Sequence, residues 1–212
     1  SIAPDYNASK GRFWSAAPEW LSQTNATSDG GNSLLLSFIQ EIDVCIDQTL
    51  SRLEEGYQID AFLWHQGESD YAKSKDYYHN LKTMVAYVRT HLTEKTGKDY
   101  SRLPFIFGTV ARSNKYFSRE VEDAMKQLAA EDPNMHLIDM SGAELLSDRL
   151  HFTAHSAEYL GRQVYKRLEQ IIKGDPVQTD GLRGKRLGII GDSYVKNHKE
   201  PVKNTWHYKF AE

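Results

Sequence analysis

The sequence predicts an α/β protein with a three-layer α/β/α fold built around a central, mostly parallel sheet. Short apolar segments of strand length alternate with longer segments whose apolar residues recur at every third or fourth position. Chains that alternate strands and helices in this way form a parallel sheet with helices on both faces. The length of 212 residues and the 40% apolar content are sufficient for one buried core.

The apolar patterns place the individual elements. A helix is expected from Ser33, where one buried stripe includes Cys45 and Gly56 ends the run. Residues 1–31 show no such periodicity and are expected to be irregular. The other predicted elements are strands at 59–66, 104–111 and 135–140, helices at about 71–95 and 119–130, and a last helix that carries Leu160, Val164, Leu168 and Ile171 on one face and ends at Gly174.

The chain is expected to have three parts. Residues 1–173 form the body, residues 174–184 have the glycine-rich polar composition of a linker, and residues 185–212 form a strand–turn–helix tail. The tail begins with KRLGIIGDSY, in which an apolar strand is followed by a tight glycine turn.

Composition excludes several classes of function. A net charge of −3 argues against a nucleic-acid partner, which needs a basic face. A single cysteine, Cys45, cannot form an intramolecular disulfide, and no Cys pair has the spacing of a metal site. No apolar run approaches the roughly 18 residues of a membrane span, and the first ten residues lack the pattern of a signal peptide. A membrane is therefore not expected as a partner.

A polar segment, WHQGESD, follows the strand predicted at 59–66, at the sheet edge where parallel sheets expose functional groups. Gln66 is interpreted as an oxyanion donor, because a neutral amide stabilises negative charge without bringing a charge that must be desolvated. Gly67 is expected to adopt an unusual backbone angle, and Glu68 belongs to the same polar cluster.

Two residues of this segment have simpler structural interpretations. Asp70 is expected to cap the helix that follows, as Asp commonly does at this position. His65 should face away from Gln66 and pack as a core histidine.

A second segment, SDRLHFT, lies between the last strand of the body and its last helix. Asp148 and His151 are three residues apart in a turn, so the carboxylate can bond Nδ1 of the imidazole and leave Nε2 as a general base. His155 could equally be the base.

A third segment, GDSY, ends the tail strand. Ser193 on a sharp strand-to-helix turn would expose its hydroxyl, and its backbone N–H could help to bind an oxyanion. A glycine turn in which Asp192 or Ser193 caps a following helix is the alternative interpretation.

The first two segments, in this order, resemble the sialate O-acetylesterase and acetylxylan esterase branch of the SGNH hydrolases over residues 1–173. In that branch the Gln of W-x-Q-G-E donates to the oxyanion and D-x-x-H supplies the base. GDSY resembles the nucleophile block of the wider GDSL/SGNH superfamily. The resemblance implies an SGNH, flavodoxin-like sheet.

The order of the motifs departs from that family, whose nucleophile block comes first. Here it comes last, Asp192 stands where this branch generally has Gln, and Ser1 and Ile2 are similar to the stretch that follows the second family block. Two explanations remain open. The tail supplies the central strand in a permuted order, or it is the start of a second SGNH domain. Pairing of residues 186–191 beside the strand at 59–65 is expected within one chain or by exchange with a second copy.

The resemblance implies a serine esterase that removes O-acetyl groups from a sugar or glycan, without metal or organic cofactor. Ser193 would be the nucleophile, His151 the base, Asp148 its orienting acid and Gln66 the oxyanion donor. A secreted or periplasmic location is implied in the same way. A non-catalytic carbohydrate-binding domain is the main alternative, and a metal-dependent hydrolase is a more distant one.

Overall fold

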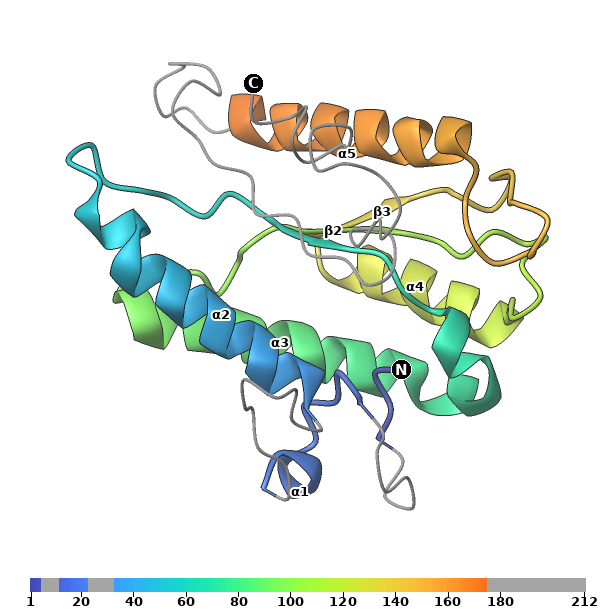
Figure 1. Cartoon of the computed structure of the whole chain (residues 1–212), viewed down its shortest axis with the longest axis horizontal. Helices are drawn as coiled ribbons and strands as arrows, with labels where there is room; N and C mark the ends of the chain where they lie inside the picture. Colours follow the sequence, from blue (N-terminus) through green and yellow to red (C-terminus); the bar gives the residue numbers. More distant parts are fainter. Residues whose placement is uncertain (5–11, 23–32, 175–212) are drawn as a thin grey trace.

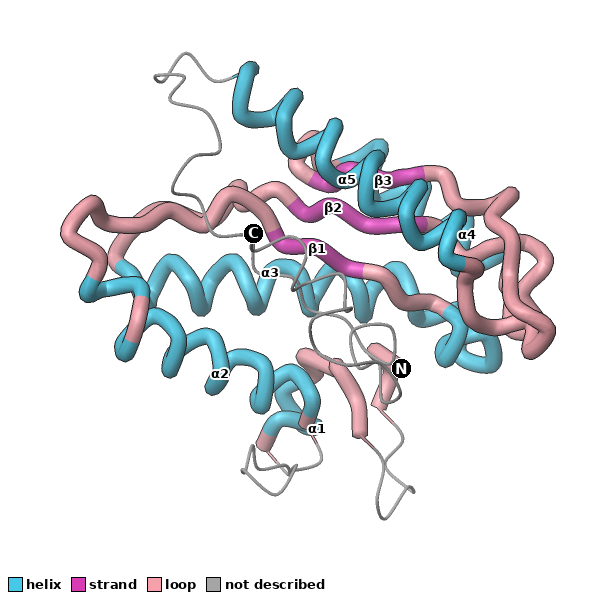
Figure 2. Tube along the Cα trace, turned by 45° about the horizontal axis from the view of Figure 1, so that its top comes forward, coloured by secondary structure: helices cyan, strands magenta, loops and turns pink. Residues whose placement is uncertain are grey.

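Three short parallel strands form the centre of the structure, and helices lie on both of their faces (Figure 1). The computed structural model describes residues 1–4, 12–22 and 33–174. The strands lie side by side in chain order (Figure 2): β1 (Phe62–Trp64), β2 (Phe105–Gly108) and β3 (Met135–Ile138). Phe105 of β2 pairs with Phe62 on one side and Met135 on the other. The predicted α/β class is confirmed.

The helices divide into two layers around this sheet. Helix α5 covers one face, and α2, α3 and α4 lie on the opposite side (Figure 1). Ser33 and Ser118 cap α2 and α4, because each side-chain oxygen accepts a backbone N–H in the first turn. The helical segments are α1 (Pro18–Leu21), α2 (Leu34–Gln48), the 3₁₀ turn η1 (Leu50–Arg52), the 3₁₀ segment η2 (Glu68–Asp76), α3 (Tyr77–Thr96), α4 (Arg119–Glu131) and α5 (Ala154–Gly174).

The side chains of the strands alternate between two cores. Phe62 and Trp64 of β1 pack in the larger core with α2, α3 and α4, whereas Leu63 points to the smaller core beneath α5. On α5 the predicted apolar face is present: Leu168 is buried in the smaller core, and Leu160, Val164 and Ile171 pack against it. Both faces of the sheet are therefore covered, as a parallel sheet requires.

The observed strands are shorter than the predicted segments 59–66, 104–111 and 135–140. Only part of each apolar run pairs with its neighbour: β1 and β2 begin after the predicted start, whereas β3 begins at Met135 and ends two residues early. The residues that follow leave the sheet and form the loops at its carboxyl edge.

Two helix predictions are also corrected. The segment 71–95 begins as η2, where Lys73 departs from helical geometry, and regular helix starts only at Tyr77. The helix after Ser33 ends at Gln48, well before Gly56, and Cys45 is exposed. In the last turns of α2 fewer of the apolar residues face the core: Ile46 is buried, but its neighbour Cys45 is not.

The predicted linker beyond Gly174, the tail strand and Ser193 lie outside the described residues. Within the part of the chain that is described, no strand pairs with the outer edge of β1 or of β3. All three residues of β1 are nevertheless buried, whereas the two central residues of β3 are half-buried. None of the described helices combines the length and the apolar character needed to cross a membrane.

Gly108, at the end of β2, allows a close approach between the sheet and His65. A Cβ atom at this position would lie 2.9 Å from His65 Nδ1 and 3.2 Å from Met140 Cγ. The absent side chain therefore creates the space in which the imidazole packs.

We expect Gly108→Ala to lower the free energy of unfolding by about 1–3 kcal/mol, because the imidazole must move to relieve the overlap. Gly161→Ala in α5 is the matched control, since a Cβ there meets no atom within 4 Å, and it should leave stability unchanged or raise it slightly. Urea denaturation of both variants measures the difference. Equal changes in the free energy of unfolding for the two variants would show that the overlap of the added Cβ with His65 does not destabilise the fold.

Candidate active site

The polar side chains singled out in the sequence lie in loops that follow the strands. Gln66 comes two residues after β1, and Asp148 and His151 lie in the loop between β3 and α5. The loop after β2 contains the buried Asn114. Because parallel strands end at the same edge of a sheet, these loops share one edge.

Asp148 and His151 form the predicted contact. Oδ2 of Asp148 lies 2.5 Å from Nδ1 of His151. Oδ1 of the same carboxylate accepts the backbone N–H groups of Leu150 at 2.9 Å and of His151 at 3.0 Å. The turn thus fixes the carboxylate, and the carboxylate fixes the ring. Both side chains are accessible, with 42% of Asp148 and 37% of His151 exposed.

These hydrogen bonds lower the pKa of Asp148 to about 2, with the bond from His151 making the largest contribution. Hydrogen bonds to the ionised form favour it over the neutral acid. Asp148 therefore stays charged throughout the neutral pH range.

The structure distinguishes among the candidate histidines. His155, in the first turn of α5, is exposed, and the contact of Asp148 is made with His151. His65 packs its ring against Phe152, with centroids 4.9 Å apart, and its Nε2 lies 3.5 Å from Glu68 Oε1. In the described residues, no group of three or more His, Cys, Asp or Glu side chains is placed to hold a metal ion.

Gln66 is buried, with 5% of its surface exposed. Its Nε2 donates to Oδ2 of Asp70 at 2.6 Å, and its backbone carbonyl accepts the Tyr77 hydroxyl at 3.0 Å. One N–H of the amide is thereby used, and the second has no acceptor among the described residues. Oε1 is buried and also has no partner in the described part of the chain.

Asp70 is not a helix cap, so that prediction is wrong. Its side chain is fully buried. Besides Gln66, it accepts the Ser1 hydroxyl at 2.7 Å and the backbone N–H groups of Ile2 at 3.0 Å and Ala3 at 3.2 Å. These donors lie 67 to 69 positions away in the sequence, so neither the local pattern nor the spacing could reveal them.

Close packing, which the sequence did not indicate, explains why residue 67 must be glycine. The backbone angles of Gly67 are φ 162° and ψ −26°, so φ lies outside the left-handed region. A Cβ there would lie 2.6 Å from Val110 Cγ2 and within 3.2 Å of Met125 and Val121. Gly67 is therefore required by close packing against α4 and the β2 loop.

Glu68 faces His65 rather than solvent, with 14% of its side chain exposed. Burial raises its pKa, but the His65 imidazole and the backbone N–H groups of Gly67 and Glu68 outweigh that effect, so the pKa lies below its ordinary value.

His65 and Asn114 connect the segments of the candidate site. The His65 ring contact places Phe152, the neighbour of His151, beside the segment that carries Gln66. Asn114 donates from Nδ2 to the Leu150 carbonyl at 3.2 Å, which ties the β2 loop to the dyad loop. Asn114 is not among the predicted site residues. Its position as a polar residue in the loop after a predicted strand is the signal in the sequence that points to it.

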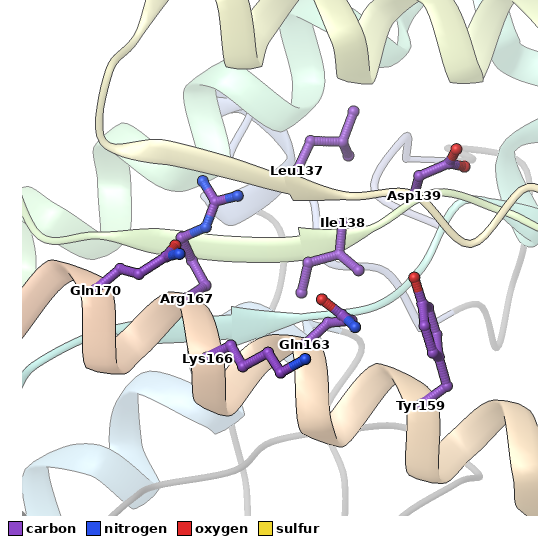
Figure 3. A pocket seen from close by; sticks show the side chains of 8 residues that line it. All are labelled: Leu137, Ile138, Asp139, Tyr159, Gln163, Lys166, Arg167 and Gln170. Carbon is purple, nitrogen blue, oxygen red and sulfur yellow. The ribbon is translucent and has the colours of Figure 1, made fainter.

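A separate hollow of about 200 Å³ lies between the outer edge of β3 and α5 (Figure 3). Tyr159, Gln163 and Lys166 line it from the helix, and Asp139 lies at the end of the strand. None of the side chains predicted for the site lines this hollow.

A family model described as a carbohydrate esterase, sialic acid-specific acetylesterase, matches residues 26–170. The chain belongs to this family. The match includes WHQGESD, which carries Gln66, and SDRLHFT, which carries Asp148 and His151. Both segments of the candidate site therefore lie within the carbohydrate esterase region.

A similar protein is known from Arabidopsis thaliana. It is named a probable carbohydrate esterase and is 31% identical over 122 residues, which are 54% of this chain and 44% of the relative. The X-ray structure of an Arabidopsis thaliana protein has a TM-score of 0.51 at 27% identity, over 65% of this chain and 53% of the other. The chain spans about half the length of these relatives.

We expect Asp70→Ala to lower the free energy of unfolding by about 2–4 kcal/mol, because four donors lose their acceptor. Asp70→Asn keeps one acceptor oxygen and should lower the free energy of unfolding by less. Asp123→Ala, at an exposed position of α4, should change stability by less than about 0.5 kcal/mol. Urea denaturation compares the three. A loss for Asp70→Ala as small as that of the control would contradict the importance of these bonds.

Proposed function

We propose that this chain is a serine esterase that removes O-acetyl groups from a carbohydrate. The contact between Asp148 and His151 at the carboxyl edge of the sheet carries the proposal. It supplies an oriented imidazole in a chain of the carbohydrate esterase family. The name of the Arabidopsis relative, a probable carbohydrate esterase, supports the same class of substrate.

In this proposal Ser193 Oγ attacks the acetyl carbonyl while His151 takes its proton. Asp148 holds the ring in one tautomer and stabilises the imidazolium that forms. The C–O bond to the sugar breaks, and His151 returns the proton to the sugar oxygen that leaves. Water then attacks the acetyl-enzyme with His151 again as base, which releases acetate and restores the serine.

Gln66 is proposed to stabilise the tetrahedral oxyanion with the N–H group that Asp70 does not use. Asp70 is a positioning residue in this scheme. Because a carboxylate only accepts hydrogen bonds, it holds the NH₂ end of the amide toward itself. The second N–H is thereby set in a fixed direction before substrate binds. The Ser193 backbone N–H is the second proposed donor.

The tail strand, residues 186–191, is proposed to pair with the outer edge of β1. The complete burial of β1 supports this pairing, because an edge strand is commonly less buried, as β3 is. A parallel strand there would bring GDSY to the carboxyl edge that also carries His151. The pairing could form within one chain or with a second copy, and a second SGNH domain that starts at the tail remains the alternative.

The test is hydrolysis of p-nitrophenyl acetate and of acetylated xylan by the purified chain. We expect activity on both, and Ser193→Ala and His151→Ala should each reduce kcat by about 10³-fold or more while the melting temperature changes little. Full activity in Ser193→Ala would assign the nucleophile elsewhere. No activity in the parent chain would favour the non-catalytic carbohydrate-binding domain.

We expect Gln66→Ala to lower kcat by about 10²–10³-fold with little change in KM, because an oxyanion donor acts only in the transition state. Gln66→Ala also removes the buried hydrogen bond to Asp70. The melting temperatures of Gln66→Ala and Asp70→Asn are therefore both measured, so that a loss of stability can be told from a loss of oxyanion binding. A rise in KM alone would make Gln66 a contact to bound substrate and would contradict the proposed role.

A further inference from the structure

Two tyrosines, Tyr71 and Tyr116, lie in the segments that carry the candidate site residues. Tyr71 follows Asp70 at the start of η2, and half of its surface, 50%, is exposed. Its ring lies 5.0 Å from that of Tyr116, in the β2 loop, with 31° between the ring planes. Lys115 places its Nζ 5.2 Å from the centre of the Tyr116 ring. These three residues are called the tyrosine platform below.

Each tyrosine is attached to one half of the candidate site by backbone that is held in place. Tyr71 directly follows Asp70, whose carboxylate accepts four hydrogen bonds, one of them from Gln66. The Tyr116 N–H donates to Asn114 Oδ1 at 2.9 Å, and Asn114 in turn bonds the Leu150 carbonyl, next to His151. The platform therefore joins the Gln66 segment to the dyad loop.

A second bond strengthens this connection. The backbone N–H of Lys115 donates to the Arg149 carbonyl at 3.1 Å, in the turn that holds Asp148 and His151. Arg149 has a φ angle of 55°, an uncommon conformation for a residue with a side chain. The loop after β2 and the loop that carries Asp148 and His151 are thus held together by these two hydrogen bonds.

We propose that the tyrosine platform binds a pyranose ring of the glycan whose acetyl group is removed, an inference that rests on the proposed function. The half-exposed Tyr71 ring offers a flat apolar face, on which the C–H face of a sugar can stack. Lys115, whose Nζ lies over the neighbouring Tyr116 ring, supplies a donor for sugar oxygens. Aromatic side chains combined with a few polar groups are the usual lining of a small-molecule site.

The connection to the site makes a sugar the preferred ligand over a general protein contact. A ring stacked on Tyr71 would lie next to the Gln66 segment and the dyad loop, where the ester must be placed. Binding energy from this remote ring would then position the acetyl group for attack. The platform is expected to matter for glycan esters and much less for a small ester that has no sugar.

The first experiment compares two substrates on the full chain. For Tyr71→Ala, the ratio of kcat/KM on acetylated xylotetraose to kcat/KM on p-nitrophenyl acetate should fall about tenfold, a loss typical of one aromatic contact. Tyr71→Phe keeps the ring and should retain the ratio. Tyr165→Ala removes a similarly exposed tyrosine on α5, 43% exposed, and should also leave the ratio unchanged.

The second experiment measures binding without catalysis. Affinity electrophoresis uses one gel that contains acetylated xylan and another that contains an O-acetylated mucin. The parent chain should be retarded in at least one of them, and Tyr71→Ala and Tyr116→Ala should migrate faster than Tyr165→Ala there.

The outcomes separate the two proposals. A parent chain that hydrolyses neither ester but is retarded through Tyr71 contradicts the esterase and supports the platform. A parent chain that hydrolyses both esters, with the same ratio in Tyr71→Ala and Tyr165→Ala, overturns the platform alone. Absence of retardation in both gels also overturns it.

Discussion

The buried Asp70 carboxylate is the interaction on which the arrangement of the Gln66 segment depends. A carboxylate loses much hydration energy on burial and is tolerated only when hydrogen bonds replace the water. Here the Ser1 hydroxyl, two backbone N–H groups and the Gln66 amide make those bonds, and no described cation forms an ion pair with it. The segment at Ser1–Ala3, the start of η2 and the Gln66 side chain are therefore held by one charge. Any movement of one of them leaves that charge less well solvated.

The dyad is stabilised in a different way. Asp148 and His151 are partly exposed and contact each other within one turn, so their geometry is local. Exposed charges in water contribute little to folding, and this pair is expected to serve chemistry more than stability. The Gln66 segment and the loop that carries Asp148 and His151 meet through partly buried contacts, namely the His65 and Phe152 rings and the bond from Asn114 to Leu150. Precision at the site thus comes from packing around Gly108 and His65 as much as from the polar residues themselves.

This difference explains how much could be predicted from the sequence. The alternation of helices and strands follows from apolar spacing, and the contact of Asp148 with His151 follows from a separation of three residues in a turn. Both are local, and both are confirmed. The role of Asp70 depends on donors at Ser1, Ile2 and Ala3, and that of Gly67 on Val110 and α4, which no local pattern indicates. The limits of the strands were missed because pairing depends on the neighbouring strand as well as on the apolar run.

The burial of β1 points to the same long-range dependence. Phe62, Leu63 and Trp64 are all buried, as in the interior of a sheet, although no described strand pairs with their outer edge. Unpaired backbone N–H and C=O groups on a strand with apolar neighbours are costly, so that edge favours a further strand. A strand added there in parallel would end beside Gln66, since its carboxyl end would lie level with that of β1. In the proposed mechanism, this one strand would both pair with β1 and bring the nucleophile near Gln66 and His151.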